Sequence, residues 1–202
     1  MQMKSITADE YQRLRAGAEV LEADSFGEKV LRLADGTILK LFRRKRLLSS
    51  AAWYPYARRF ADNAVAMRRR GIAVPEIIDI VRIPSIARDA VHYHPLPGES
   101  LRHLLRAGMD PDTRQTLRNA FTRFVIELHD KGVYFRSLHL GNVLHLPDGR
   151  FGLIDIADAR LRPWRLGRHL RRRNLRLLLA AGGERELVDT AAVVAGRSAA
   201  SG

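Results

Sequence analysis

The chain contains no cysteine, which excludes disulfide bonds, thiolate metal sites and cysteine nucleophiles. It also lacks a long apolar run of the kind that spans a membrane, and its polar first residues, 1–10, do not resemble a signal peptide. No internal repeat and no low-complexity segment is present. These absences favour a protein of a reducing compartment, and we expect it in the cytoplasm.

Acidic residues are few: 22 Asp and Glu stand against 35 Lys and Arg, which gives a net charge of +13 over 202 residues. Such a balance favours anionic partners, namely nucleic acid, acidic lipid headgroups or phosphorylated ligands, unless the arginines only form a solvated surface. A nucleic-acid-binding module has no further support, because neither a binding motif nor an interleaving of aromatic and basic residues accompanies the charge.

Length and a hydrophobic content of 46% predict a globular protein of one domain or two small lobes. The strands and helices that the residue patterns predict make its expected fold class α+β. We expect a first lobe over residues 1–94 and a mainly helical second lobe over residues 95–202, divided at the Pro/Gly-rich stretch 95–98. In the first lobe the patterns predict a helix over 5–18 with a Thr7–Glu10 capping box, strands over 19–23, 29–33, 37–42, 76–83 and 91–94, and a helix within 47–70.

The second lobe is expected to begin with short and long helices over 99–107 and 111–131, the latter capped by Asp110. After residue 158 the sequence is strongly basic, and a helix is predicted that turns its arginines outward. Its apolar seam would contain Leu166, Leu170, Asn174, Leu177 and Leu178. A last short helix is predicted over 184–194.

Residues 134–158 carry the strongest functional signal. Two apolar strands, 142–146 and 151–156, flank a Pro147-Asp148-Gly149 turn, which is typical of a β-hairpin. The polar residues at the ends of these strands are more numerous than a structural hairpin needs: Ser137, His139, Asn142, Asp155 and Asp158. Mg²⁺ prefers oxygen ligands, so Asn142 and Asp155 suit a metal, and the hairpin predicts the floor of a phosphoryl-transfer site.

Two features of the first lobe are also candidates. Lys40 alternates with apolar neighbours and shares a face with Ile38 and Phe42, so it needs either an anionic partner or access to solvent at a strand edge. His92 and His94 have the spacing of two metal ligands, but no third ligand accompanies them, which favours a structural role.

The segment Phe135–Asn142 (FRSLHLGN) resembles the catalytic loop of kinase-fold enzymes, and Leu153–Ala157 (LIDIA) resembles their metal-binding segment. Together with LKLFR at 39–43 and PLPG at 95–98, the chain resembles the bacterial lipopolysaccharide core heptose kinases and the related toluene-tolerance proteins. The resemblance implies a protein-kinase-like two-lobe fold, with ATP and Mg²⁺ as cofactors and a sugar hydroxyl as acceptor. It also implies that arginines after Asp158 hold a phosphorylated, membrane-associated glycolipid, which would place the protein at the inner membrane surface.

The same resemblance assigns roles to individual residues. Lys40 would contact the nucleotide phosphates, and Gly27 would belong to the turn that covers them. The segment His92, Tyr93 and His94 would meet adenine through backbone groups. Asn142 and Asp155 would hold Mg²⁺.

Three departures leave two functions open. Ser137 stands where kinases carry the aspartate that orients the acceptor, with His139 or Asp158 as replacements. The stretch 47–70 has no glutamate to pair with the strand lysine, and Asp62 or Asn63 is the nearest substitute. No long activation segment follows Asp155, which disfavours a peptide substrate. The chain is therefore expected to be either a sugar kinase or a pseudokinase that serves as a nucleotide-binding or scaffold protein in envelope synthesis.

Overall fold

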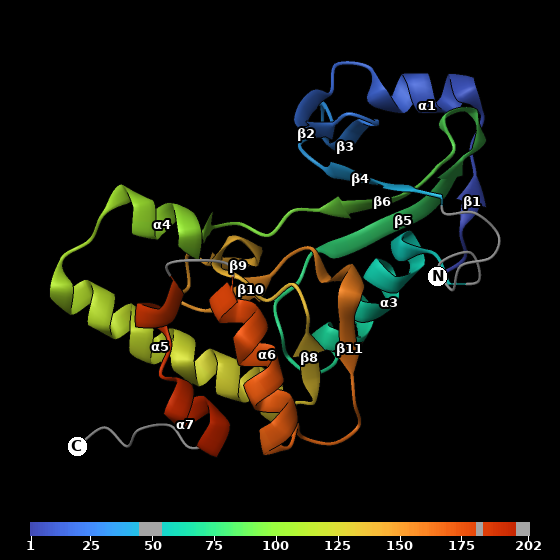
Figure 1. Ribbon diagram of the computed structural model, residues 1–202. Coiled ribbons are helices and arrows are strands. Elements are labelled where there is room, and N and C mark those ends of the chain that lie inside the picture. Colours follow the sequence, from blue (N-terminus) through green and yellow to red (C-terminus); the bar gives the residue numbers. More distant parts are fainter. Residues whose placement is uncertain (45–53, 181–183, 197–202) are drawn as a thin grey trace. The chain divides into compact units, whose positions relative to one another are not determined.

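The computed structural model describes residues 1–44, 54–180 and 184–196 and is an α+β protein, as the sequence predicts (Figure 1). The chain forms two compact units. The first contains Met1–Ala66 and Pro75–Leu96, and the second contains Met67–Val74 and Pro97–Gly202. The junction at Leu96 falls in the predicted Pro/Gly stretch, whereas the early segment Met67–Val74 belongs with the second unit. Among the described residues, no helix combines the length and the apolar character needed to cross a membrane.

The first unit is built on a sheet whose described strands follow the order β1-β5-β6-β4-β3-β2. Neighbouring strands are antiparallel, except that β1 runs parallel to β5. The predicted meander and the later strands are confirmed, and their bounds are β1 (Lys4–Ser5), β2 (Glu19–Asp24), β3 (Gly27–Arg32), β4 (Ile38–Arg43), β5 (Glu76–Ile83) and β6 (Arg88–His94).

Helix α1 (Ala8–Arg15) covers one face of this sheet. Its predicted capping box is confirmed: the backbone N–H of Glu10 donates to Thr7 Oγ1 at 3.2 Å, and the Glu10 carboxylate accepts from the Thr7 N–H at 2.6 Å. Tyr11 of this helix is buried in a cluster with Leu39 and Leu41 of β4. The cluster therefore fixes which side chains of β4 face α1.

Helix α3 (Tyr56–Arg68) begins directly after Pro55. Through Phe60 it packs on Phe42 and Tyr93, on the face of the sheet opposite to the α1 cluster. The Phe60 ring centroid lies 5.4 Å from that of Tyr93 and 6.4 Å from that of Phe42. Trp53, which was predicted on this helix, lies outside the described residues, as do Lys45 and Arg46 of the basic run before it.

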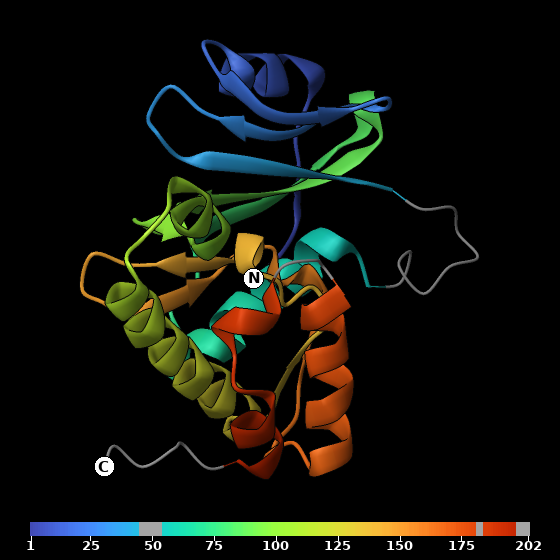
Figure 2. The same ribbon diagram turned by 60° about the vertical axis from the view of Figure 1, so that its left-hand side comes forward.

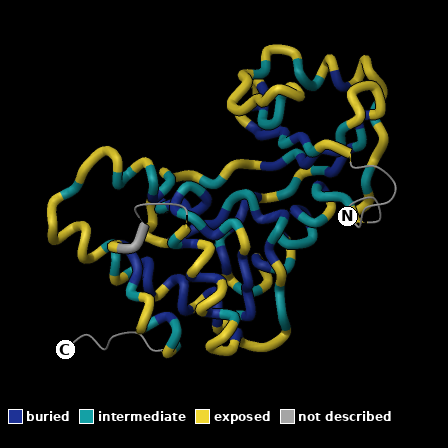
Figure 3. The backbone as a smooth tube through the Cα atoms, in the orientation of Figure 1, coloured by how far each residue is buried: buried dark blue, intermediate teal, exposed yellow. Residues whose placement is uncertain are grey.

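The second unit contains the long helix predicted after Asp110, which caps it through a bond from the Thr113 N–H to Oδ1 at 2.9 Å. Its buried face includes Phe121, Val125 and Leu128. The backbone tube of Figure 3 is dark blue along much of this unit, where buried residues lie. Helix α7 contacts both α5 and α6 (Figure 2). The small sheets β10-β9-β7 and β11-β8 complete the unit. The element bounds are β7 (Glu99–Ser100), α4 (Leu101–Ala107), α5 (Pro111–Asp130), β8 (Val133–Phe135), η2 (Leu140–Asn142), β9 (Val143–His145), β10 (Phe151–Leu153), η3 (Ile156–Asp158), β11 (Ala159–Leu161), α6 (Arg168–Ala180), η4 (Glu184–Leu187) and α7 (Thr190–Ala195).

The predicted seam of the basic helix was wrong in two respects. Leu177 is exposed, whereas Leu175 is buried. Arg171 does not point outward but is buried, with its guanidinium bonded to the carbonyl oxygens of Leu166 and Val193 and paired with Asp130. A buried guanidinium needs such partners, because an unpaired charge in a protein interior is costly.

Two predicted helices are shorter than expected. Residues Glu99 and Ser100 form strand β7, which pairs with β9, so the helix starts only at Leu101. The last predicted helix is a 3-10 turn, η4, followed by the separate helix α7 with Asp189 as its N-cap.

Gly132, which ends the loop after α5, gives a strong stability prediction. Its φ is +74°, and a Cβ added there would lie 2.6 Å from the carbonyl oxygen of Trp164. We expect Gly132→Ala to lower the free energy of unfolding by about 2–4 kcal/mol, since both backbone strain and a clash with main chain oppose the methyl group. The measurement is urea-induced unfolding. Gly149→Ala is the matched control, because Gly149 has a φ of +79° but open space around it. Equal losses in the two variants would contradict the packing argument.

Candidate functional site

The hairpin returns its two polar ends to one place. Val143 of β9 pairs with Leu153 of β10, and the N–H of Ile154 donates to the carbonyl oxygen of Asn142 at 3.0 Å. The strands are shorter than predicted: Asn142 ends the η2 turn before β9, and Asp155 lies beyond the end of β10. Both residues therefore sit at the open end of the hairpin, on backbone that is no longer regular strand.

Asn142 is buried and held by its own loop. Its Nδ2 donates to the Ser137 carbonyl oxygen at 2.9 Å, and its backbone N–H donates to the His139 carbonyl oxygen at 2.8 Å. The amide orientation is thus fixed through its nitrogen. The amide oxygen is the atom of this side chain that is chemically suited to a hard cation.

Asp155 adopts a left-handed backbone conformation, with φ 54° and ψ 41°. Among the described non-glycine residues, only Ala87 shares a positive φ. Aspartate tolerates this region better than most residues, but the conformation still costs free energy and concentrates at functional sites. The backbone here is set by the site rather than by strand regularity, which ends at Leu153.

Ser137 and Asp158 form a pair across the site. The Ser137 hydroxyl donates to Asp158 Oδ2 at 2.6 Å, so the Asp158 carboxylate lies directly beside Ser137. The other oxygen, Oδ1, is buried and has no hydrogen-bond partner among the described residues. Burial raises the pKa of Asp158, hydrogen bonds from Ser137 oppose the rise, and the charge of Asp155 adds to it. The pair places a carboxylate of raised basicity next to Asp155.

His139 and Arg102 lie close to the same loop. A Cβ added at Gly141 would be 3.1 Å from Arg102 Nη1 and 3.2 Å from His139 Nδ1, so the missing side chain of Gly141 makes room for both. The Nδ1 of His139 is buried and has no hydrogen-bond partner within the described part of the chain. Arg102, from α4, was not singled out in the sequence. No sequence signal identifies it, because its proximity depends on the packing of α4 against η2.

Asn174 of α6 holds strand β8, which leads into the loop that carries Ser137 and His139. Its Nδ2 donates to the Phe135 carbonyl oxygen at 2.6 Å, and its Oδ1 accepts from the Phe135 N–H at 3.4 Å. His129 Nε2 lies 3.1 Å from the same Oδ1, and burial lowers the pKa of His129 to about 4. A neutral imidazole and a buried amide thus fix β8 from the side opposite β11. In the sequence, the only sign of this hydrogen-bonded arrangement is that Asn174 falls within the predicted leucine-rich seam of the helix.

The nucleotide candidates lie in the first unit. Lys40 is half-buried, shares a face with Phe42 as predicted, and has its Nζ 5.9 Å from the Phe42 ring centroid. Gly27 opens β3 after a hairpin turn, with a φ of +106° and no atom within 4 Å of an added Cβ. Asp62 is the suggested substitute for the missing glutamate that would pair with Lys40. Its carboxylate accepts a hydrogen bond from the Tyr54 hydroxyl at 2.8 Å and lies 3.7 Å from Arg58.

The three residues expected to meet adenine, His92, Tyr93 and His94, differ in how their backbones are paired in the sheet. His92 and Tyr93 are paired with β4 on one edge and with β5 on the other, whereas His94 pairs with Glu76 of β5 alone among the described strands. The side chain of His92 is occupied by the Thr37 hydroxyl at 2.7 Å, and burial lowers its pKa. Among these three residues, His94 is the one with a paired strand on a single side within the described sheet.

The described residues contain no cluster of three or more His, Cys, Asp or Glu that would hold a metal by itself. Asn142 with Asp155 supplies two oxygen donors, which suits Mg²⁺, since this ion keeps several waters and often takes one or two protein ligands. No protein-family model matches the sequence, and no match to it is found among curated proteins.

Proposed function

We propose that the protein is an ATP- and Mg²⁺-dependent phosphotransferase with a protein-kinase-like two-lobe fold, which transfers phosphate to a sugar hydroxyl of the lipopolysaccharide core. The observation that carries this proposal is the grouping of Ser137, Asn142, Asp155 and Asp158 at one end of the hairpin. Structural hairpins have no need of a buried amide, a left-handed aspartate and a half-buried carboxylate at one end.

In this proposal Asn142 and Asp155 hold Mg²⁺, which supplies charge neutralisation for the transferring phosphoryl group. Lys40 contacts the nucleotide phosphates and His94 the adenine. Gly27 belongs to the turn over the phosphates. Arg102, beside Gly141, adds a positive charge next to the loop.

Asp158 takes the role of the missing aspartate. Its carboxylate accepts a hydrogen bond from the Ser137 hydroxyl, and its Oδ1 has no hydrogen-bond partner among the described residues. The carboxylate is therefore the proposed acceptor for the proton of the acceptor hydroxyl. The raised pKa makes this carboxylate a better base than an exposed aspartate. His139, the alternative, presents a buried Nδ1 but is not bonded to Ser137.

A second function, a pseudokinase that binds nucleotide without transfer, is favoured by the serine at position 137 and by the engagement of Asp62 with Tyr54 and Arg58. Such a protein would act as a scaffold in envelope synthesis. The two functions share the nucleotide site and differ in turnover.

A thermal-shift titration with ATP and Mg²⁺ tests the shared site. We expect the unfolding temperature to rise with ATP and Mg²⁺ together, because a ligand that binds only the folded state stabilises it by about 2.7 kcal/mol at a hundred times its Kd. Parallel measurement of ADP release decides between the two functions. A shift with turnover supports the kinase, and a shift without turnover supports the pseudokinase. An unchanged unfolding temperature at saturating ATP and Mg²⁺ refutes both.

A further inference from the structure

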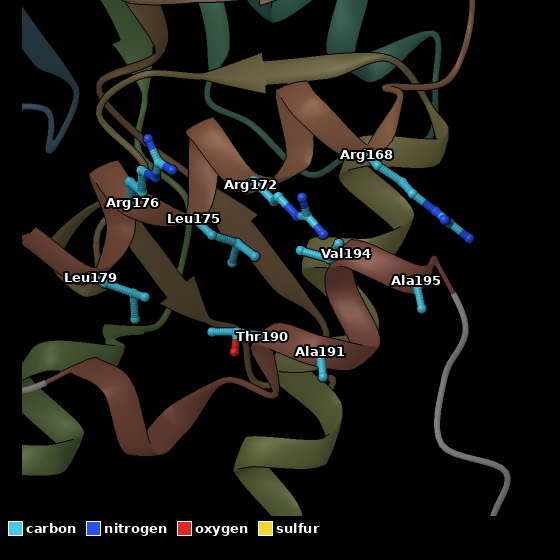
Figure 4. A pocket seen from close by; sticks show the side chains of 9 residues that line it. All are labelled: Arg168, Arg172, Leu175, Arg176, Leu179, Thr190, Ala191, Val194 and Ala195. Atoms are coloured by element: carbon cyan, nitrogen blue, oxygen red, sulfur yellow. The ribbon is translucent and has the colours of Figure 1, made fainter.

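An open groove lies between α6 and α7, away from the hairpin residues described above (Figure 4). Its volume is about 560 Å³, which is in the range of small-molecule sites. All its lining residues come from these two helices: Arg168, Arg172, Leu175, Arg176, Leu179, Thr190, Ala191, Val194 and Ala195.

One side of the groove carries a row of positive charge. Arg168, Arg172 and Arg176 are spaced four residues apart on α6, so they fall on one helix face over about 12 Å. No acidic residue is among the described lining residues. Guanidinium groups bind phosphate oxygens in a bidentate fashion, and a row of three selects an anionic ligand.

The rest of the groove is apolar. Leu175 of α6 lies toward Val194 of α7, and Leu179 lies toward the start of α7 at Thr190; Ala191 and Ala195 complete the apolar lining (Figure 4). A free phosphate or a sugar phosphate would leave this apolar wall exposed to water, whereas the hydrocarbon part of an amphiphile would bury it. Among the residues that the structure describes, no aromatic side chain lines the groove, so these residues offer no platform for nucleic-acid bases.

The segment before α6 has the character of a membrane interface. Trp164 is 63% exposed and lies between Arg162 and Arg165, four residues before Arg168. Leu177 on α6 is also exposed. Tryptophan flanked by arginine is typical of the level of lipid headgroups, where the ring contacts hydrocarbon and its N–H contacts water or headgroups.

We propose that the α6–α7 groove binds an anionic phospholipid of a membrane surface, with the headgroup phosphate at the row Arg168, Arg172 and Arg176 and hydrocarbon against the half-buried Leu179 and Val194. Trp164 inserts at the headgroup level beside it. This site does not depend on phosphoryl transfer, so a protein that binds lipid without kinase activity supports it all the same.

The test is sedimentation of the full chain with vesicles of phosphatidylcholine, with and without phosphatidylglycerol. We expect binding only to the anionic vesicles. The triple variant Arg168→Gln/Arg172→Gln/Arg176→Gln should lose affinity on the order of 100-fold, since each arginine near an anionic surface contributes about fivefold. Leu179→Gln should also weaken binding, although it leaves the charge unchanged.

The matched control removes three exposed arginines of the same unit that lie outside the groove: Arg69→Gln/Arg106→Gln/Arg173→Gln. Its affinity should fall less than tenfold. In a Trp53→Phe background, the fluorescence of Trp164 should shift to the blue with anionic vesicles. Circular dichroism checks that each variant is folded.

Several results would overturn the proposal. Equal losses in the two triple variants would mean that general charge, not the groove, attracts the membrane. Release of the protein from the vesicles by inorganic phosphate would show that the groove binds small anions rather than lipid. DNA binding that the groove arginine substitutions weaken equally would show that it binds nucleic acid. Self-association without lipid that the groove substitutions abolish would assign it to a second copy of the chain.

Discussion

The Asp155→Asn protein is expected to lose phosphoryl transfer from ATP by roughly a thousandfold, because several kcal/mol of charge neutralisation at the phosphates depend on a carboxylate that holds the metal. The substitution is nearly isosteric. Asparagine tolerates the left-handed conformation of this position as well as aspartate does, so the fold should be retained. The measurement is the initial rate of ADP release and of phosphate incorporation into lipopolysaccharide core.

Asp148→Asn is the matched control for this variant. Asp148 lies in the turn at the other end of the same hairpin, is exposed, and accepts a hydrogen bond from the backbone N–H of Arg150 at 3.0 Å. It should retain turnover within about twofold. Unchanged turnover and core phosphorylation in Asp155→Asn would show that the metal site is assigned to the wrong residue.

The Asp158→Asn protein should lose turnover by roughly 10²–10⁴-fold, with ATP affinity unchanged, because the loss of a general base slows proton removal from the acceptor. An asparagine at this position can still accept the hydrogen bond from the Ser137 hydroxyl, so the local geometry is kept while basicity is lost. Single-turnover kinetics at saturating ATP separate this effect from binding. A loss of ATP affinity that accounts for the whole effect would contradict the role of Asp158 as base.

Ser137→Ala distinguishes a base from a structural carboxylate. The Ser137 hydrogen bonds lower the pKa of Asp158, so removing the hydroxyl raises this pKa further. Activity that needs the ionised carboxylate should then be lost on acidification at a higher pH than in the wild-type protein. A merely structural Asp158 would leave the acid limb of the pH–rate profile in place.

The elements that the sequence predicts well are those whose causes are local. Thr7 and Asp110 cap their helices through backbone groups three residues away, and the Asp148-Gly149 turn sets the hairpin by itself. The face shared by Lys40 and Phe42 follows from strand alternation alone.

The features that the sequence does not predict depend on distant partners. Arg171 is buried because Asp130 and two carbonyl oxygens from other segments meet it, and nothing around position 171 in the sequence carries that information. The choice of Leu175 over Leu177 for the core depends on the rotation of α6 against its neighbours. Arg102 lies near Gly141 only because β7 pairs with β9 and directs α4 onto the loop.

The site itself is divided in the same way. Motif spacing indicates Asn142 and Asp155, and hairpin pairing brings them together. The left-handed backbone of Asp155 and the bond between Ser137 and Asp158 follow from tertiary packing after β10 ends. Under the proposed function, that bond favours Asp158 over His139, which the sequence leaves as equal candidates for the role of the missing aspartate.

Anomalous diffraction from a crystal grown with Mn²⁺ and ATP tests whether the open end of the hairpin holds a metal ion together with ATP, as we propose. We expect an anomalous peak at about 2.1 Å from the Asn142 amide oxygen and from the Asp155 carboxylate. An ordered nucleotide whose metal peak lies elsewhere, or the absence of any peak at these two side chains, would contradict it.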